Sequence, residues 1–215
     1  MFKMNLLMCA AIVGVIASQA AARTGDSRKA AEIGEKAPGF VLTTLQGGEI
    51  KLSDYKGKIV VLEWTNHQCP VVQRYVVKQK SMQSTLASLK EKAPEAGAGR
   101  NMDVVWLAID SSHFCREKKT DIQKYYEAQK IDYPYLLDAS GKVGRRYGAK
   151  TTPHMFVIDQ KGILAYAGSL DDDRYGGAEN PRNYVAEAVT ALLNGSTVEV
   201  SKTKPFGCSV KYKKD

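Results

Sequence analysis

The sequence predicts an α/β domain with a central mixed β-sheet flanked by helices. Two nearly continuous apolar segments, 58–64 and 104–109, are typical of strands that are buried on both faces of a parallel sheet. Segments with helical spacing follow each of them, so strand and helix alternate. A β-hairpin and a last helix then complete the domain, which adds antiparallel strands to the sheet.

The first half of the domain begins with a strand expected within 33–42, a turn at 47–48 and a short strand at 50–52. After the buried strand 58–64, one helix is predicted to begin near residue 72 and to end before Pro94, because apolar side chains keep the spacing of one helix face. The residues of that face are Val72, Tyr75, Val76, Met82, Leu86 and Leu89.

The second half contains the buried strand 104–109, a helix marked by Ile122 and Tyr126, a short strand at 135–137, and a hairpin of 156–158 with 163–167. The last helix has clear boundary signals. Asn180 is expected to cap it, Pro181 to begin it and Asn194-Gly195 to end it.

Residues 1–22 have the features of a secretory signal peptide: Lys3, an apolar stretch at 6–16, and three alanines before Arg23. The apolar stretch is too short to span a bilayer, so no stable membrane anchor is expected. We therefore expect an exported protein, periplasmic or otherwise extracytoplasmic. It is predicted to have a flexible N-terminus at 23–32, one domain at 33–195 and a C-terminal tail at 196–215.

The charge and cysteine content limit the function classes. The formal net charge is +8, and it falls to about +7 when Lys3 is removed with the signal peptide. This charge is spread along the chain, which favours a solvated surface over nucleic-acid binding. Cys9 is also removed, and three cysteines remain: Cys69, Cys115 and Cys208. An odd number in a domain large enough to bury its own core suggests reactive rather than structural cysteines.

Cys69 stands where a nucleophilic thiolate is usually built. It follows the apolar strand 58–64 and a short turn, and Pro70 begins an amphipathic segment. If Cys69 caps a helix whose first residue is Pro70, the free N–H groups and the positive end of the helix dipole favour the thiolate over the thiol.

Three motifs carry a resemblance to a known family. They are Gly34-x-x-Ala37-Pro38-x-Phe40, Gly57-Lys58-x-Val60-Val61, and Thr152-Pro153 followed by Phe156-Val157-Ile158-Asp159. Residues from about 33 to 195 resemble the redoxin branch of the thioredoxin superfamily, which includes the AhpC/TSA proteins and the exported thioredoxins of cytochrome maturation. The resemblance implies a thioredoxin-like fold, with Cys69 as the attacking cysteine and Pro153 as a cis-proline beside it.

The sequence departs from two patterns of that superfamily. Disulfide-reducing thioredoxins usually carry Cys-x-x-Cys, whereas Val72 holds the second position here. Peroxiredoxins usually place a threonine or serine three residues before the attacking cysteine and an arginine near the proline position, and these places hold Asn66 and Pro153. Arg145 or Arg146 could substitute for that arginine only if the fold brings it to the sulfur.

Cys69 therefore needs a distant resolving partner, because its first product is a mixed disulfide or a sulfenic acid. Cys208 is the preferred candidate, since it lies in a tail with turn residues that could fold back across the domain. Redoxin-like exported proteins often end in a similar Gly-Cys segment, and this resemblance supports the choice. Cys115 is the alternative, because its loop follows the strand 104–109 and opens toward the same sheet edge.

The three histidines, His67, His113 and His154, also follow strand ends or adjoin the proline motif. They are either polar loop residues, or, for His67 and His154, groups that lower the pKa of Cys69 or move its proton. A third possibility is a copper or zinc site built from His67, Cys69, His113 and Cys115. Glu63 is either a structural strand residue or a buried proton acceptor.

The leading hypothesis is an exported thiol-dependent oxidoreductase that needs no cofactor. Its Cys69 thiolate would attack a disulfide of a protein or small molecule, or a hydroperoxide, with Cys208 as the resolving residue. A peroxiredoxin-type peroxidase with an antioxidant role and a copper- or zinc-binding module are the alternatives.

Overall fold

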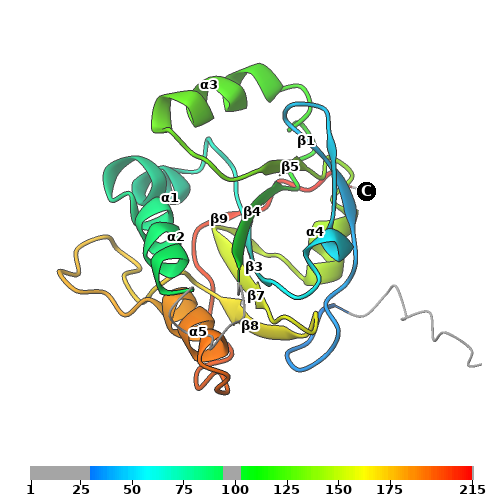
Figure 1. Ribbon diagram of the computed structural model, residues 1–215. Helices are drawn as coiled ribbons and strands as arrows, with labels where there is room; N and C mark the ends of the chain where they lie inside the picture. Colours follow the sequence, from blue (N-terminus) through cyan, green and yellow to red (C-terminus); the bar gives the residue numbers. More distant parts are fainter. Residues whose placement is uncertain (1–29, 94–102, 215) are drawn as a thin grey trace, which may run out of the picture.

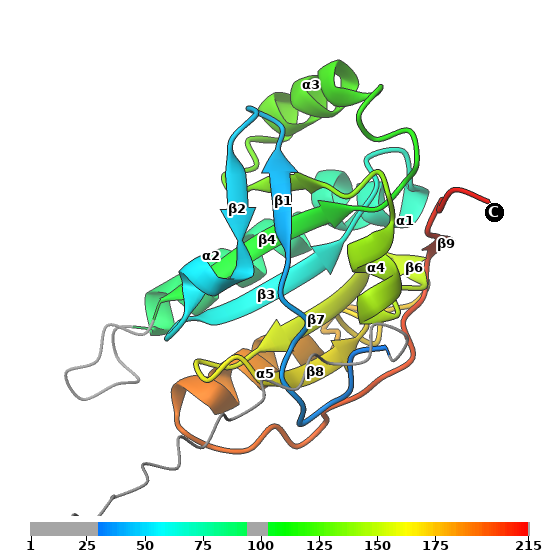
Figure 2. The same ribbon diagram turned by 90° about the vertical axis from the view of Figure 1, so that its right-hand side faces the viewer.

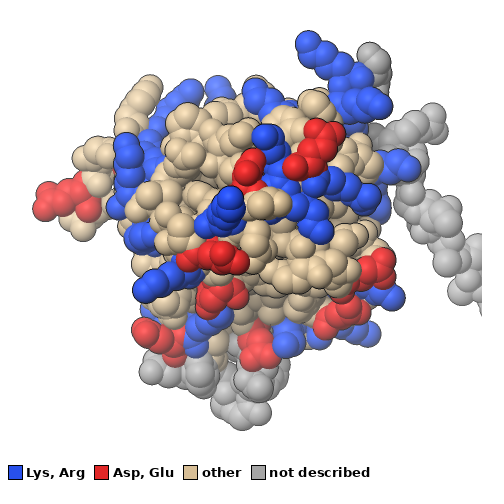
Figure 3. Space-filling view, turned by 90° about the horizontal axis from the view of Figure 1, so that it is seen from above, with Lys and Arg blue, Asp and Glu red and all other residues tan. Residues whose placement is uncertain are grey.

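The computed structural model describes residues 30–93 and 103–214. The signal peptide predicted at 1–22 and most of the N-terminal segment 23–32 lie outside these residues. Within them, no helix is long and apolar enough to cross a membrane. Figure 3 views the molecule from above helix α3 (Lys119–Gln129), which lies at the top of Figure 1. This face carries basic side chains with acidic ones interspersed among them.

The core of the fold is a seven-stranded mixed sheet with the strand order β2-β1-β5-β4-β3-β7-β8 (Figure 1). Strands β3, β4 and β5 are parallel, and all other neighbours pair antiparallel. A separate pair, β6 with β9, lies outside this sheet. The strands are β1 (Val41–Thr44), β2 (Glu49–Lys51), β3 (Ile59–Trp64), β4 (Val104–Asp110), β5 (Tyr135–Leu137), β6 (Thr151–Thr152), β7 (His154–Ile158), β8 (Leu164–Gly168) and β9 (Cys208–Ser209).

Helices cover both faces of the sheet and create two hydrophobic cores. On one face, α2 (Ser81–Lys92), α3 (Lys119–Gln129) and α5 (Tyr184–Leu193) pack against side chains of β3, β4 and β7. On the other face, α4 (Lys142–Tyr147) and the N-terminal segment pack against the alternate side chains of the same strands (Figure 2). The predicted α/β fold with a central mixed sheet between helices is therefore confirmed.

The helix predicted to begin near residue 72 is interrupted in the structure. It consists of α1 (Pro70–Gln73), a π-helical turn η2 (Arg74–Lys78) and α2, and Lys80 separates the last two with a left-handed φ of 57°. The N–H of Gln79 donates to the carbonyl of Arg74, which adds a residue to the turn. The buried residues keep their spacing across this break, so the apolar pattern gave no sign of it.

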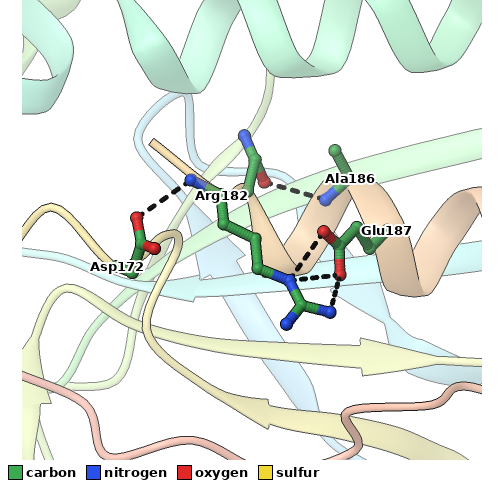
Figure 4. A network of polar contacts seen from close by, with 5 residues as sticks. Asp172, Arg182, Ala186 and Glu187 are labelled. Atoms are coloured by element: carbon green, nitrogen blue, oxygen red, sulfur yellow. Dashed lines mark hydrogen bonds and ion pairs between the residues drawn. The ribbon is translucent and has the colours of Figure 1, made fainter. Parts of the chain in front are cut away.

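The predicted start of the last helix is wrong. Asn183, not Asn180, caps α5, because its side-chain oxygen accepts a hydrogen bond from the N–H of Ala186 at 2.8 Å. The preceding Arg182 makes a bidentate contact with Glu187, and its own N–H donates to Asp172 (Figure 4). The chain thus enters α5 from an extended segment, and Pro181 lies before the helix.

Two further short elements differ from the predictions. The first strand, β1, begins at Val41, because residues 33–40 mostly run along the β7–β8 hairpin with a single bridge between Lys36 and Ile163. Helix α4 was not predicted. It is short and contains Gly144, a poor helix former, so its sequence lacks a helical signal.

Candidate active site

The end of β3 places Cys69 at the carboxyl edge of the parallel strands. Asn66 shapes the turn: its side-chain oxygen accepts the N–H of Gln68 at 2.8 Å, and its carbonyl accepts the N–H of Cys69 at 2.9 Å. The amide nitrogen of Asn66 donates to the Ser112 hydroxyl beyond the end of β4. Cys69 is then the N-cap of α1, with Pro70 as the first helical residue.

The C-terminal tail brings Cys208 to this point. Strand β9 pairs antiparallel with β6, so that Cys208 lies opposite Thr152 and Ser209 opposite Thr151 (Figure 2). The sulfur atoms of Cys69 and Cys208 are 2.8 Å apart, although 139 positions separate them in the sequence. Cys69 is only 4% exposed. The tail therefore both supplies a second thiol and covers the first.

Gly207 permits this close approach. Its φ is +139°, a conformation that residues with side chains rarely adopt. A Cβ atom at this position would collide with the carbonyl oxygen of Thr152. The Thr152–Pro153 peptide bond is cis, as the resemblance implied, and Pro153 is buried beside the same contact. Gly207 is thus required by the backbone geometry of this contact, and sequence reasoning gave it no specific role.

The two thiols have opposite pKa shifts. Burial alone would raise the pKa of Cys69, but hydrogen bonds from the thiol of Cys208, the hydroxyl of Thr152 and the backbone N–H groups of Val72 and Cys208 lower it below its ordinary value. Burial, together with the hydrogen bond to Cys69 and its charge, raises the pKa of Cys208 to about 11. Between these two pKa values the pair therefore favours a Cys69 thiolate that accepts a hydrogen bond from the thiol of Cys208.

Cys115 has a different environment. It is 0% exposed within the core between the sheet and its helices. Burial and the negative charges of Asp110 and Asp138 raise its pKa to about 12. These conditions suppress its thiolate, so Cys115 is a core residue in this structure.

The imidazole charge expected beside Cys69 is absent near neutral pH. Burial lowers the pKa of His67, and burial and Lys150 lower that of His154 to about 3. The Nδ1 atom of His154 accepts the N–H of Lys150 at 3.3 Å. The Nδ1 atom of His67 is buried without a hydrogen-bond partner, and the centroids of the His67 and Tyr125 rings are 6.2 Å apart. The thiolate is thus stabilised by hydrogen bonds and not by a charged histidine.

Residues considered for the two alternative functions do not assemble at the site. In the part of the chain that the structure describes, no three His, Cys, Asp or Glu residues form a group that could hold a metal ion. The copper or zinc site predicted from His67, Cys69, His113 and Cys115 is therefore wrong, and the rings of His113 and Phe114 instead contact each other edge to face. All four of these predicted ligands lie within the described residues.

The arginine of a peroxidase site is not supplied by α4. Arg145 donates to the carbonyl of Lys213, and Arg146 donates to the carbonyl of Gly39. Glu63 is buried on β3, where it accepts hydrogen bonds from Trp106 at 2.9 Å and Tyr133 at 3.3 Å. Burial raises the pKa of Glu63 despite these donors.

A groove of about 310 Å³ lies beside the two sulfurs. Lys211 is its charged residue, and it belongs to the tail itself. The other lining residues are polar or apolar: Asn66, Gln68, Cys69, Pro70, Phe114, Thr152, Cys208 and Ser209.

Comparisons with known proteins agree with this arrangement. The AhpC/TSA family model matches residues 33–167, which include Cys69 and Pro153. The chain belongs to the AhpC/TSA family. The match ends before the tail, so family membership assigns no role to Cys208.

Relatives within this family include the thiol-disulfide oxidoreductase ResA of Bacillus thuringiensis subsp. konkukian. It is 28% identical over 131 residues, which cover 61% of this chain and 66% of ResA. ResA of Geobacillus kaustophilus is 29% identical over 135 residues, or 63% of this chain and 68% of that protein. The chain thus spans about two thirds of the length of these relatives.

Solved structures confirm the thioredoxin-like fold. An uncharacterized conserved protein from Geobacillus kaustophilus has a TM-score of 0.71 and 26% identity, covering 86% of this chain and 94% of that one. A hypothetical protein from Sinorhizobium meliloti 1021 has the same TM-score with 24% identity, covering 87% and 98%. The peroxidoxin BcpB of Mycobacterium tuberculosis, at 19% identity and a TM-score of 0.52 over 77% of this chain and 97% of its own, shares the fold.

Proposed function

We propose that this protein is an exported thiol–disulfide oxidoreductase whose redox pair is Cys69 and Cys208. The observation that carries the proposal is the 2.8 Å separation of their sulfur atoms, with the pKa of Cys69 lowered and that of Cys208 raised. The activity of the ResA relatives supports the reaction type. Protein or small-molecule disulfides are the proposed substrates.

The first step is attack of the Cys69 thiolate on a substrate disulfide. A bond forms between the Cys69 sulfur and one substrate sulfur, the substrate S–S bond breaks, and the second substrate sulfur leaves as a thiolate that takes a proton from solvent. The donors around Cys69 lower its pKa and so increase the fraction of thiolate at a given pH.

The second step follows from the electrostatics of the pair. Once Cys69 is in a mixed disulfide, it no longer carries the negative charge that helps to raise the pKa of Cys208. The N–H of Val71, which favours the Cys208 thiolate, remains. Cys208 then loses its proton to the leaving substrate sulfur and attacks the Cys69 sulfur. The products are the Cys69–Cys208 disulfide and a reduced substrate, so a dithiol donor must reduce the protein for the next cycle.

Export is proposed from the signal-like residues 1–22. Expression of the full chain with a C-terminal tag should give a mature N-terminus at Arg23 in an extracytoplasmic fraction. A full-length N-terminus in the cytoplasmic fraction would refute export without affecting the redox assignment.

The redox pair is tested by thiol mapping of the purified protein after reaction with oxidised glutathione. Mass spectrometry should find Cys69 joined to Cys208, with Cys115 reduced. Cys208→Ser should stop after one turnover with glutathione bound to Cys69, whereas Cys69→Ser should not react and Cys115→Ser should behave as wild type. A Cys69–Cys115 bond, or full turnover by Cys208→Ser, would refute the assignment.

A further inference from the structure

The tail continues beyond Cys208 and is fixed to the domain at each of the next positions. The N–H of Val210 donates to the carbonyl of Lys150 at 3.1 Å, and the carbonyl of Lys211 accepts the N–H of His113 at 2.9 Å. Val210 is buried in the second core. The redox chemistry itself uses none of these contacts, so they raise the question of what the last residues do.

Tyr212 has the most elaborate contacts of this segment. Its hydroxyl donates to the carbonyl of Ala149 at 2.8 Å, and its ring packs against the second core. The guanidinium carbon of Arg145 lies 4.6 Å from the ring centroid, within the range of a cation–π interaction. Arg145 also donates to the carbonyl of Lys213 at 2.9 Å, so it holds the chain on the far side of the ring.

Helix α4 leaves room for this ring because its N-cap, Gly141, and its third residue, Gly144, are both glycines. A Cβ atom on Gly141 would lie 2.6 Å from Cδ1 of Tyr212, and one on Gly144 would lie 2.5 Å from its hydroxyl. The helix therefore presents a socket, formed by Gly141, Gly144 and Arg145, into which the side chain of Tyr212 fits. In Figure 2, α4 lies next to β6 and the end of the tail.

The tail has a second attachment upstream of the redox cysteine. The N–H of Thr203 donates to the carbonyl of Ala167, and its hydroxyl oxygen accepts the N–H of Ser169 at 3.0 Å. Cys208 thus lies between an attachment at Thr203 and one at Tyr212. A segment held at both ends keeps its middle residues at a high effective concentration near their target, whereas release of one end lowers it.

We propose that Tyr212, seated in the socket of α4, is a positioning residue that holds Cys208 and its backbone N–H against Cys69. The proposal rests on the proposed redox pair and adds a residue that touches neither substrate nor sulfur. Release of Tyr212 would weaken two donors that stabilise the Cys69 thiolate, and it would uncover a sulfur that the docked tail keeps nearly inaccessible. The same anchor therefore controls both resolution and access.

The test uses full-length mature protein and measures resolution directly. Reduced protein mixed with oxidised glutathione releases one glutathione when the Cys69 thiolate attacks the glutathione disulfide, and a second when Cys208 resolves the mixed disulfide. Tyr212→Ala should slow the second release by about 10-fold or more, since the effective concentration of Cys208 falls. Tyr212→Phe keeps the ring and should slow the second release only a few-fold, because it removes only the hydrogen bond to Ala149.

Tyr175→Ala is the matched control. Tyr175 also has an arginine over its ring, at 6.0 Å, but it is 89% exposed and belongs to the loop before α5. Its substitution should leave the second release unchanged. The pH dependence of Cys69 alkylation gives a second readout: its midpoint should rise in Tyr212→Ala and stay constant in Tyr175→Ala.

The outcomes separate this inference from the proposed function. If wild type itself never releases the second glutathione, the redox pair is wrong. If wild type does and Tyr212→Ala resolves at the same rate with the same Cys69 midpoint, the positioning role is wrong. Should Tyr212→Ala fail to fold, Arg145→Ala removes the cation over the ring and the contact to Lys213, and an unchanged resolution rate in that variant overturns the inference equally.

Discussion

Gly207→Ala should undock the tail while leaving both redox sulfurs in the protein. The substitution places a methyl group against the carbonyl oxygen of Thr152 and forces a side-chain-bearing residue to a φ of +139°. Backbone strain of this kind costs on the order of 1–3 kcal/mol, which corresponds to about a 5- to 150-fold smaller docked fraction. The tail can escape the strain by leaving β6, so the cost should fall on docking and not on the fold of the domain.

The assay is the equilibrium between the reduced protein and its Cys69–Cys208 disulfide in glutathione buffers of varied composition. Gly207→Ala should require a more oxidising buffer than wild type to reach the same fraction of Cys69–Cys208 disulfide, in proportion to the decrease in the docked fraction of the tail. Gly195→Ala is the control, because Gly195 also has a positive φ of +69° but no atom within 4 Å of an added Cβ. If Gly207→Ala oxidises in the same buffer as wild type, the backbone conformation at Gly207 does not position Cys208.

Three further results are expected. The alkylation rate of Cys69 should rise with pH around a midpoint below about 8.5, the ordinary pKa of a cysteine thiol. Cys208→Ala should raise that midpoint, because the thiol that donates a hydrogen bond to Cys69 is lost. An equal midpoint in both proteins would contradict this. Cys115 should react with iodoacetamide only after unfolding, since it is 0% exposed, and modification in the native state would refute its core assignment. Burial raises the pKa of Glu63 in the folded protein above its unfolded value, so the free energy of unfolding should fall as the pH rises from the unfolded pKa through the folded pKa. Glu63→Gln keeps an acceptor for Trp106 and should reduce this fall in denaturant titrations. An unchanged dependence of the unfolding free energy on pH in this variant would assign the fall to other groups.

The sheet could be predicted from the sequence because its central strands have few alternatives. All six residues of β3 are buried, and its register with β4 matches Val61 to Trp106 and Leu62 to Leu107. An apolar run of this length has no solvent-exposed face, and the sequence shows it directly. The sequence did not reveal the break at Lys80 or the start of α5. The first depends on one backbone dihedral angle and the second on one capping hydrogen bond, and neither changes the apolar spacing.

Local motifs predicted only the first half of the candidate site, whereas Cys208 was preferred over Cys115 from its place in the tail and from the family resemblance. Cys69 and Pro153 lie in local motifs, and the resemblance of those motifs to a family gave their place on the fold. Which thiol meets Cys69 depends instead on contacts between segments far apart in the chain. The role of the histidines was left open for the same reason, because burial decides whether an imidazole is charged, and no local pattern around His67 or His154 reports it.

The tail explains how a family domain without a second motif cysteine could act on disulfides. Val72 occupies the place where a neighbouring cysteine would stand, and the N–H of that residue donates to Cys69 instead. The second thiol comes from β9, and its neighbour Gly207 allows the backbone approach. In a Cys-x-x-Cys turn the two sulfurs are held together by the helix that carries them, whereas here their contact depends on a strand from the distant end of the chain. Access to Cys69 and the resolution of its mixed disulfide are therefore opposite requirements on one segment: the tail must move away for a substrate to enter and return for the product to leave.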